Sequence, residues 1–155
     1  MIQNSLTYLC FIFLVLSFLG CGEPNRIGAV KVSGTVTVDG QPMEGITVIF
    51  NPVHNNGLAA SGTTDNQGVY ILTSPGAPYN TGAVPGEFIP TFSKTESEIL
   101  ESTSIEDYKQ KYGDRIPKII YLIPEKYSKV KTCGISPCIV EKGKSNIFDF
   151  ELSTK

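Results

Sequence analysis

The chain has 155 residues, which is room for one domain, and its 13 basic and 15 acidic side chains give a formal net charge of −2. That balance excludes the basic excess of a nucleic-acid-binding protein, so no nucleic-acid partner is expected. No acidic tail is present either.

The first 20 residues differ from the rest because they carry no charged side chain. Their apolar run, from Tyr8 to Leu19, has twelve residues. A membrane-spanning helix needs about 20, whereas a signal-peptide core is of this length. We therefore predict a signal peptide over residues 1–20, although the usual basic segment before the apolar run is missing. A secretory signal cleaved nearby and an N-terminal anchor helix are the alternatives.

The apolar run ends in Phe18-Leu19-Gly20-Cys21-Gly22, with an apolar residue three before the cysteine and a small one just before it. This pattern resembles the lipobox of bacterial lipoproteins. The resemblance implies that the Cys21 thiol is acylated and that cleavage makes it the new N-terminus. The expected location is the bacterial cell envelope, as a membrane-anchored lipoprotein facing the periplasm. Because Gly22 is not the Asp that retains some lipoproteins at the inner membrane, the outer membrane is expected.

Two further cysteines, Cys133 and Cys138, remain after Cys10 leaves with the signal peptide and Cys21 takes the lipid. An even pair in an exported protein is a disulfide candidate. Five extended residues span about 16 Å, whereas bonded cysteines have Cα atoms about 4.4–6.8 Å apart, so the segment must turn. Its glycine and proline permit a turn, and we predict the disulfide. The alternative is two separate thiols along a strand.

Residues 21–28 are predicted to be a tether and residues 29–155 a folded domain. Strands are predicted over 29–38, 46–53, 59–64 and 69–73, with apolar residues at every second position in the first two. Asp39-Gly40 and Asp65-Asn66-Gln67-Gly68 separate them as turns, and Gly68 is expected in the left-handed conformation. A run of antiparallel strands follows from this pattern.

The same stretch reads V-x-G-x-V-x-x-D-G-x-P-x-x-G-x-x-V-x-F-x-P, then A-x-G-x-T-D-x-x-G-x-Y-x-L. With Gly82–Phe88, Pro124–Tyr127 and Gly143–Leu152, this order of motifs resembles the carboxypeptidase regulatory-like family. The resemblance covers most of the mature chain. It implies an all-β fold, a transthyretin-like Greek-key β-sandwich of about seven strands, with a short helical insertion. Domains of this family accompany metallocarboxypeptidases but are not their catalytic domain.

The chain departs from the family pattern at two places besides the cysteine pair. Pro90 falls within a predicted strand, so that strand is expected to be an edge or to bulge there. Residues 95–122 are an insertion, with a short surface helix predicted over about 104–112, capped by Ser104 and ended by Gly113. The apolar run 119–123 is expected to pack on the sandwich; a partner surface is the alternative.

No catalytic residue, metal site or cofactor is predicted. His54 is the only histidine, it lies in a loop of Asn and Gly, and no G-x-S-x-G sequence accompanies it. A single histidine and a close cysteine pair do not make a zinc ligand set. The acidic run of Glu96, Glu98, Glu101, Glu106 and Asp107 is interpreted as a solvated face.

These observations predict a non-catalytic, lipid-anchored envelope module with a structural or protein-interaction role. Its partners would be the membrane, through the lipid, and an unknown envelope protein or glycan. The alternative function is carbohydrate binding. The chain has no Trp, so the candidate stacking platforms for a sugar are Tyr79, Tyr108, Tyr112, Tyr121 and Tyr127.

Overall fold

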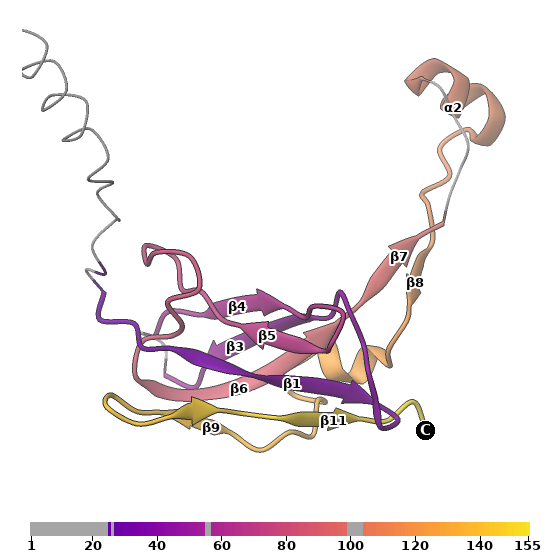
Figure 1. Cartoon of the computed structure of the whole chain (residues 1–155). Helices are drawn as coiled ribbons and strands as arrows, with labels where there is room; N and C mark the ends of the chain where they lie inside the picture. The colour runs from indigo at the N-terminus through magenta and orange to yellow at the C-terminus, as the bar shows by residue number, and fades with distance from the viewer. Residues whose placement is uncertain (1–24, 26, 55–56, 99–103) are drawn as a thin grey trace, which may run out of the picture.

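The computed structural model describes residues 25, 27–54, 57–98 and 104–155. The predicted signal peptide and Cys21 lie outside the described residues. Two sheets face each other as a sandwich, and a small third sheet projects from one end (Figure 1). The all-β sandwich with a short helical insertion, predicted from the sequence, is confirmed.

The first sheet is organised around β1 (Val32–Val38), whose residues alternate between buried and half-buried positions. The C-terminal strands β10 (Asn146–Ile147) and β11 (Phe150–Leu152) pair with it in parallel. Its antiparallel neighbours are β2 (Gln41–Pro42) and β5 (Val69–Ile71). The chain therefore returns at its end to the strand with which the domain begins.

The second sheet has the order β4-β3-β6-β9. These strands are β3 (Thr47–Pro52), β4 (Ala60–Thr63), β6 (Gly86–Ser93) and β9 (Cys138–Val140). All the pairings between them are antiparallel. The observed strands are shorter at their ends than the predicted ranges, and the described residues form eleven strands, several of only two or three residues.

Pro90 lies within β6, opposite Phe50 of β3. Val53 and Glu87 form a hydrogen-bonded pair. Because hydrogen-bonded and non-hydrogen-bonded pairs alternate along an antiparallel ladder, Phe50 and Pro90, three positions along, form a non-hydrogen-bonded pair. The proline nitrogen therefore faces the β9 side, where pairing has already ended at Phe88. The expectation of an edge holds for this half of β6, although the strand is interior to the sheet at its beginning.

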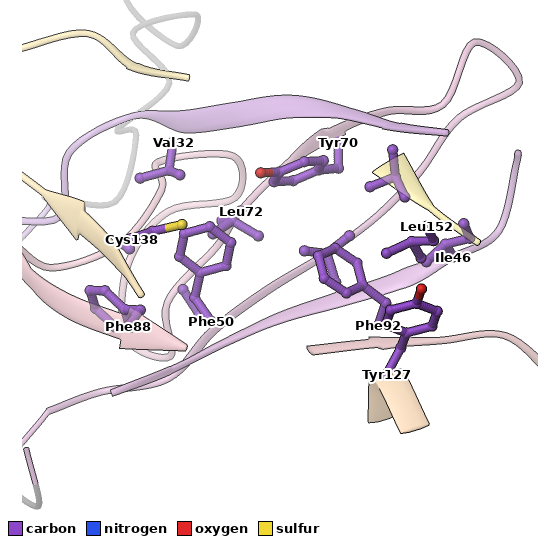
Figure 2. Close-up of a cluster of buried hydrophobic side chains, with 14 of the residues drawn as sticks. Val32, Ile46, Phe50, Tyr70, Leu72, Phe88, Phe92, Tyr127, Cys138 and Leu152 are labelled. Carbon is purple, nitrogen blue, oxygen red and sulfur yellow. The ribbon is translucent and has the colours of Figure 1, made fainter. Parts of the chain in front are cut away.

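The core fills the space between the two sheets, with Phe50 at its centre (Figure 2). The Phe50 ring is fully buried. Four aromatic rings have centroids 5.7–6.5 Å from it, those of Tyr70, Phe88, Phe148 and Phe150. Such tilted and edge-on pairs add to the free energy gained by burying the rings.

The two predicted turns have the expected chemistry. Asp39 and Gly40 both have positive φ, 49° and 79°, as a two-residue hairpin turn requires. Asp65 Oδ1 accepts hydrogen bonds from the backbone N–H groups of Gln67 and Val69, both at 2.9 Å. Gly68 has φ 74°, which confirms the left-handed conformation predicted for it.

Gly34 allows β1 to lie close to the segment between β10 and β11. A Cβ atom at this position would lie 1.8 Å from the carbonyl oxygen of Phe148. That oxygen accepts a hydrogen bond of 2.8 Å from the buried Tyr70 hydroxyl. The next amide, Thr35 N–H, donates to Asp149 Oδ1 at 2.7 Å, so a side chain continues the ladder between β10 and β11. Gly34 and Asp149, which belong to the motifs of the family resemblance, thus have structural roles.

Candidate functional site: the projecting arm

The third sheet and the helix form an arm that leaves the sandwich after β6. The arm consists of β7 (Thr95–Ser97), α2 (Ile105–Tyr112) and β8 (Ile119–Tyr121), the last antiparallel to β7. Val30 bridges Ala83, so β1 and β6 both begin near the tether, and the arm lies at the opposite end of the sandwich (Figure 1). No helix in the described part of the chain is long and apolar enough to span a membrane.

Local sequence builds the helix of the arm. Ser104 is its N-cap, with the side-chain oxygen accepting from Asp107 N–H at 3.1 Å. Gly113 follows the last turn with φ 62°, and its N–H donates to Lys109 O at 2.9 Å. The predicted helix and both of its caps are confirmed. None of the residues of α2 is buried, so packing contributes little to it.

A polar brace joins the two sides of the arm. The Arg115 guanidinium donates to both carboxylate oxygens of Glu98, at 2.7 and 2.8 Å. Lys118 N–H donates to the same carboxylate at 3.3 Å, and the Tyr108 hydroxyl donates to Arg115 O. Hydrogen bonds and an ion pair, in which one guanidinium nitrogen contacts both carboxylate oxygens, therefore hold the arm, and none of its described residues belongs to the buried core cluster.

Apolar side chains lie exposed along the arm. Their exposed fractions are 73% for Ile105, 85% for Ile116, 57% for Ile119, 46% for Ile120 and 43% for Tyr121. The sequence did not single out Ile105 and Ile116; an isolated Ile among polar neighbours is the pattern that could have indicated them. The three consecutive residues of β8 are all exposed, and contiguous exposed apolar surface is what marks a contact site for another molecule.

The prediction that the run 119–123 packs on the sandwich was wrong for its first three residues. Leu122 N–H pairs with Lys94 O at 2.9 Å, and pairing with β7 carries residues 119–121 away from the core. Only Ile123, 2% exposed, reaches the core cluster, just before the short helix η1 (Glu125–Ser128).

Cys133 and Cys138 are both free and buried, so the disulfide predicted between them is not formed in this structure. Cys138 lies in β9 with its sulfur in the core beside Phe50 (Figure 2), whereas Cys133 is outside that core cluster. The Cys133 thiol donates instead to Val130 O at 3.5 Å. Burial raises the pKa of the Cys138 thiol from 9.0 to about 11, which makes it a poor nucleophile.

The other candidate residues that the structure describes do not form a reactive cluster, and Glu101 of the acidic run lies outside the described residues. His54 is exposed at the tether end, where it lines an apolar hollow of about 370 Å³ with Ile27 and Phe88. Among the described residues, no group of three His, Cys, Asp or Glu side chains could hold a metal ion. In the acidic run, Glu98 pairs with Arg115 and Asp107 with Lys111, at 2.7 and 3.6 Å.

The five candidate tyrosines occupy different surroundings. Tyr79 is 86% exposed, and Tyr121 is 43% exposed on the arm. Tyr108 and Tyr112 pair on α2 with ring centroids 5.3 Å apart. Tyr127 is only 6% exposed, and its hydroxyl accepts from Ser153 N–H at 3.0 Å, which excludes it as a stacking platform.

Comparison with known proteins assigns no family to this chain. No family model matches it, and no curated protein matches it. Among solved structures, a 9R-lipoxygenase from Cyanothece PCC8801 is similar to it with a TM-score of 0.37 and 10% identity. The match covers 86% of this chain but only 18% of the lipoxygenase, and a likeness this distant supports no functional inference.

Proposed function

We propose that the protein is a non-catalytic, lipid-anchored module of the bacterial cell envelope that presents its arm to a protein partner. Cys21 would carry the lipid and hold the chain at the periplasmic face of the outer membrane. The family resemblance of the sandwich motifs, to carboxypeptidase regulatory-like domains, belongs to the same proposal. The sandwich would then act as a rigid mount between the anchor and the arm.

The observation that carries this proposal is the position of the arm. β8, which carries the exposed Ile119, projects from the end of the sandwich opposite the start of β1 (Figure 1), and Ile27, which precedes β1, is only six residues from Cys21. Six extended residues reach about 20 Å, so an acylated Cys21 would keep the Ile27 end near the bilayer. The arm would then point away from the membrane, toward other envelope components.

Acylation and membrane attachment can be tested on the full chain. We expect the native protein to fractionate with membranes and to have the mass of an acylated N-terminal Cys21. Cys21→Ser should be released, because lipid chains contribute about 0.8 kcal/mol of membrane affinity per buried CH₂. A Cys21→Ser chain that stays with membranes, or a native chain without added lipid mass, would contradict the anchor.

The role of the arm can be tested by photo-crosslinking in intact cells. A crosslinker at Ile116 should give one adduct of discrete mass, and Ile119→Asp should abolish it, since a charge would oppose burial in a contact. The matched control is a crosslinker at Ile147, 62% exposed but on β10 of the sandwich. Equal adducts from both positions would argue against a specific contact by the arm.

A further inference from the structure

Two adjoining hollows lie on the outer surface where β4 runs beside β5. The first has a volume of about 410 Å³ and is lined by residues that include Thr63, Asp65 and Tyr79. The second, of about 480 Å³, lies against Ala59 and Ser74. Ser61 and Thr73 line both, so the hollows form one continuous depression, which we call the seam groove.

Backbone pairing fixes which side chains face the seam groove. Ser61 and Thr73 exchange two hydrogen bonds, of 3.0 and 2.8 Å, and Asp65 N–H donates to Val69 O at 2.9 Å. Since side chains alternate along a strand, Ser61, Thr63 and Asp65 share the outer face with the partners across the seam. Polar groups therefore line one side of the groove, and the more apolar residues of β5 line the other.

Tyr79 forms a wall of the seam groove. It sits in the loop after β5, which rises beside β4 and β5 in Figure 1. The loop is held from both sides of this residue, because Asn80 N–H donates to Thr73 Oγ1 at 2.9 Å and Thr81 Oγ1 donates to Pro78 O. The ring of Tyr79 is nevertheless 86% exposed, so an aromatic face is available to a ligand.

Ser74 is a buried polar residue beside the seam groove. It lines the second hollow, is 1% exposed, and its hydroxyl has no hydrogen-bond partner in the described part of the chain. Buried hydroxyl groups in native proteins are nearly always paired, because an unpaired one is unfavourable. Because side chains alternate and Thr73 faces the groove, the Ser74 hydroxyl lies on the inner face and is not accessible to a ligand in the groove.

The charges around the seam groove restrict the chemistry of that ligand. Among the residues that the structure describes, Asp65 is the one charged side chain in the lining, and none of the described Lys, Arg or His residues contributes to either hollow. An anionic ligand would find no counter-charge among these described residues, and one carboxylate is too few for a cation site. A neutral molecule with hydroxyl groups and an apolar ring face fits all these features.

We propose that the seam groove binds a neutral saccharide, with a pyranose ring stacked on Tyr79 and sugar hydroxyls bonded to Ser61 and Thr63. Carbohydrate binding was open from the sequence, but without a location. This activity is additional to the proposed protein contact. It depends neither on Cys21 nor on the arm, so each proposal can fail alone.

The test uses the full chain with three probes: cellotetraose, maltotetraose and the tetramer of N-acetylglucosamine. We expect saturable binding of at least one, with Kd on the order of 1 mM, in a ligand-observed NMR titration. Tyr79→Ala should weaken binding about tenfold, because the stacking platform is lost. Tyr121→Ala, which removes an exposed ring on the arm, should bind as the native protein does.

Ser74→Ala is a second control, because it alters a residue beside the groove whose hydroxyl is buried. Removing an unpaired hydroxyl should leave the unfolding midpoint unchanged or raised, since no hydrogen bond is lost. The same change should leave saccharide binding unchanged, because the buried hydroxyl does not reach the groove. The proposal is overturned if none of the three probes saturates below about 20 mM. It is also overturned if Tyr79→Ala binds normally or if Tyr121→Ala weakens binding as much as Tyr79→Ala.

Discussion

The sandwich and the arm are ordered by different forces. In the sandwich, Val36, Phe50 and Leu152 are fully buried and drawn from both sheets. In the arm, no residue of α2 is buried, and order comes from the Ser104 cap, the Arg115–Glu98 pair and a short ladder. The buried core of the sandwich therefore provides the global stability of the domain, while the arm leaves apolar surface available for contact.

The largest expected effect comes from breaking the core. Phe50→Ala removes the ring that four other aromatic rings surround, and should lower the free energy of unfolding by about 3–5 kcal/mol. Ile116→Ala, in the arm, should change it by less than about 0.5 kcal/mol. Urea unfolding measures both. Comparable losses would mean that the arm and the sandwich are a single cooperative unit.

A smaller loss is expected where the ends of the chain meet in the sandwich. Gly34→Ala would force a methyl group against Phe148 O and disturb its hydrogen bond with Tyr70. We expect a cost of about 1–3 kcal/mol or more in urea unfolding. The control is Gly86→Ala, because a Cβ there meets only ordinary contacts at 3.6 Å. If both variants were equally stable, the close approach of Gly34 to Phe148 would be refuted.

High pH should lower the stability of the sandwich, because two of its buried groups lose protons. Burial raises the pKa of the Cys138 thiol to about 11 and also raises that of the Tyr70 hydroxyl. Both groups are neutral when protonated, and burial favours the neutral form. Their contribution to the free energy of unfolding is therefore complete below the unfolded-state pKa of the thiol, about 9, and declines as pH rises through 11. The melting temperature should therefore fall by a few degrees between pH 8 and 11.

Cys138→Val is the matched variant for the pH effect, since it keeps an apolar side chain without a titrating group. Its melting temperature should decline less over the same range, with Tyr70 accounting for the remainder. An identical decline in the variant and the native protein would show that Cys138 does not contribute.

The smallest effect is expected from loosening the arm. Arg115→Gln removes a partly exposed ion pair with Glu98, worth roughly 0.2–1 kcal/mol. Amide hydrogen exchange should rise in the arm, while urea unfolding of the sandwich stays the same. Lys144→Gln breaks a comparable pair with Glu141 at the tether end and should leave exchange in the arm unchanged. Slower amide exchange in the arm of Arg115→Gln would contradict a stabilising role for the Arg115–Glu98 pair.

Local sequence predicted the elements that local chemistry determines. The left-handed Gly68, the Asp65 turn and the capped helix at Ser104 all depend on neighbours within a few residues. The alternating pattern of β1 likewise indicated which side chains are buried. These predictions succeeded because the interactions that stabilise each element lie within the segment that was analysed.

Long-range pairing decided the rest. Ile119 and Ile123 are equally apolar, yet pairing with β7 leaves the first exposed and the second buried. Cys133 and Cys138 are close in sequence, yet the core takes only the second. The seam groove joins residues of β4, β5 and the loop at Tyr79, and no spacing in the sequence indicates that they meet.

The sequence by itself determined the class of the fold, the turns and the capped helix, because backbone conformation and alternating burial follow from residue type and order. Only the tertiary structure decided that the insertion stands away from the sandwich, that the two thiols are separate and that Ser74 is unpaired. Each of these depends on which segment fills the space beside a side chain, and that is settled by the whole packed chain.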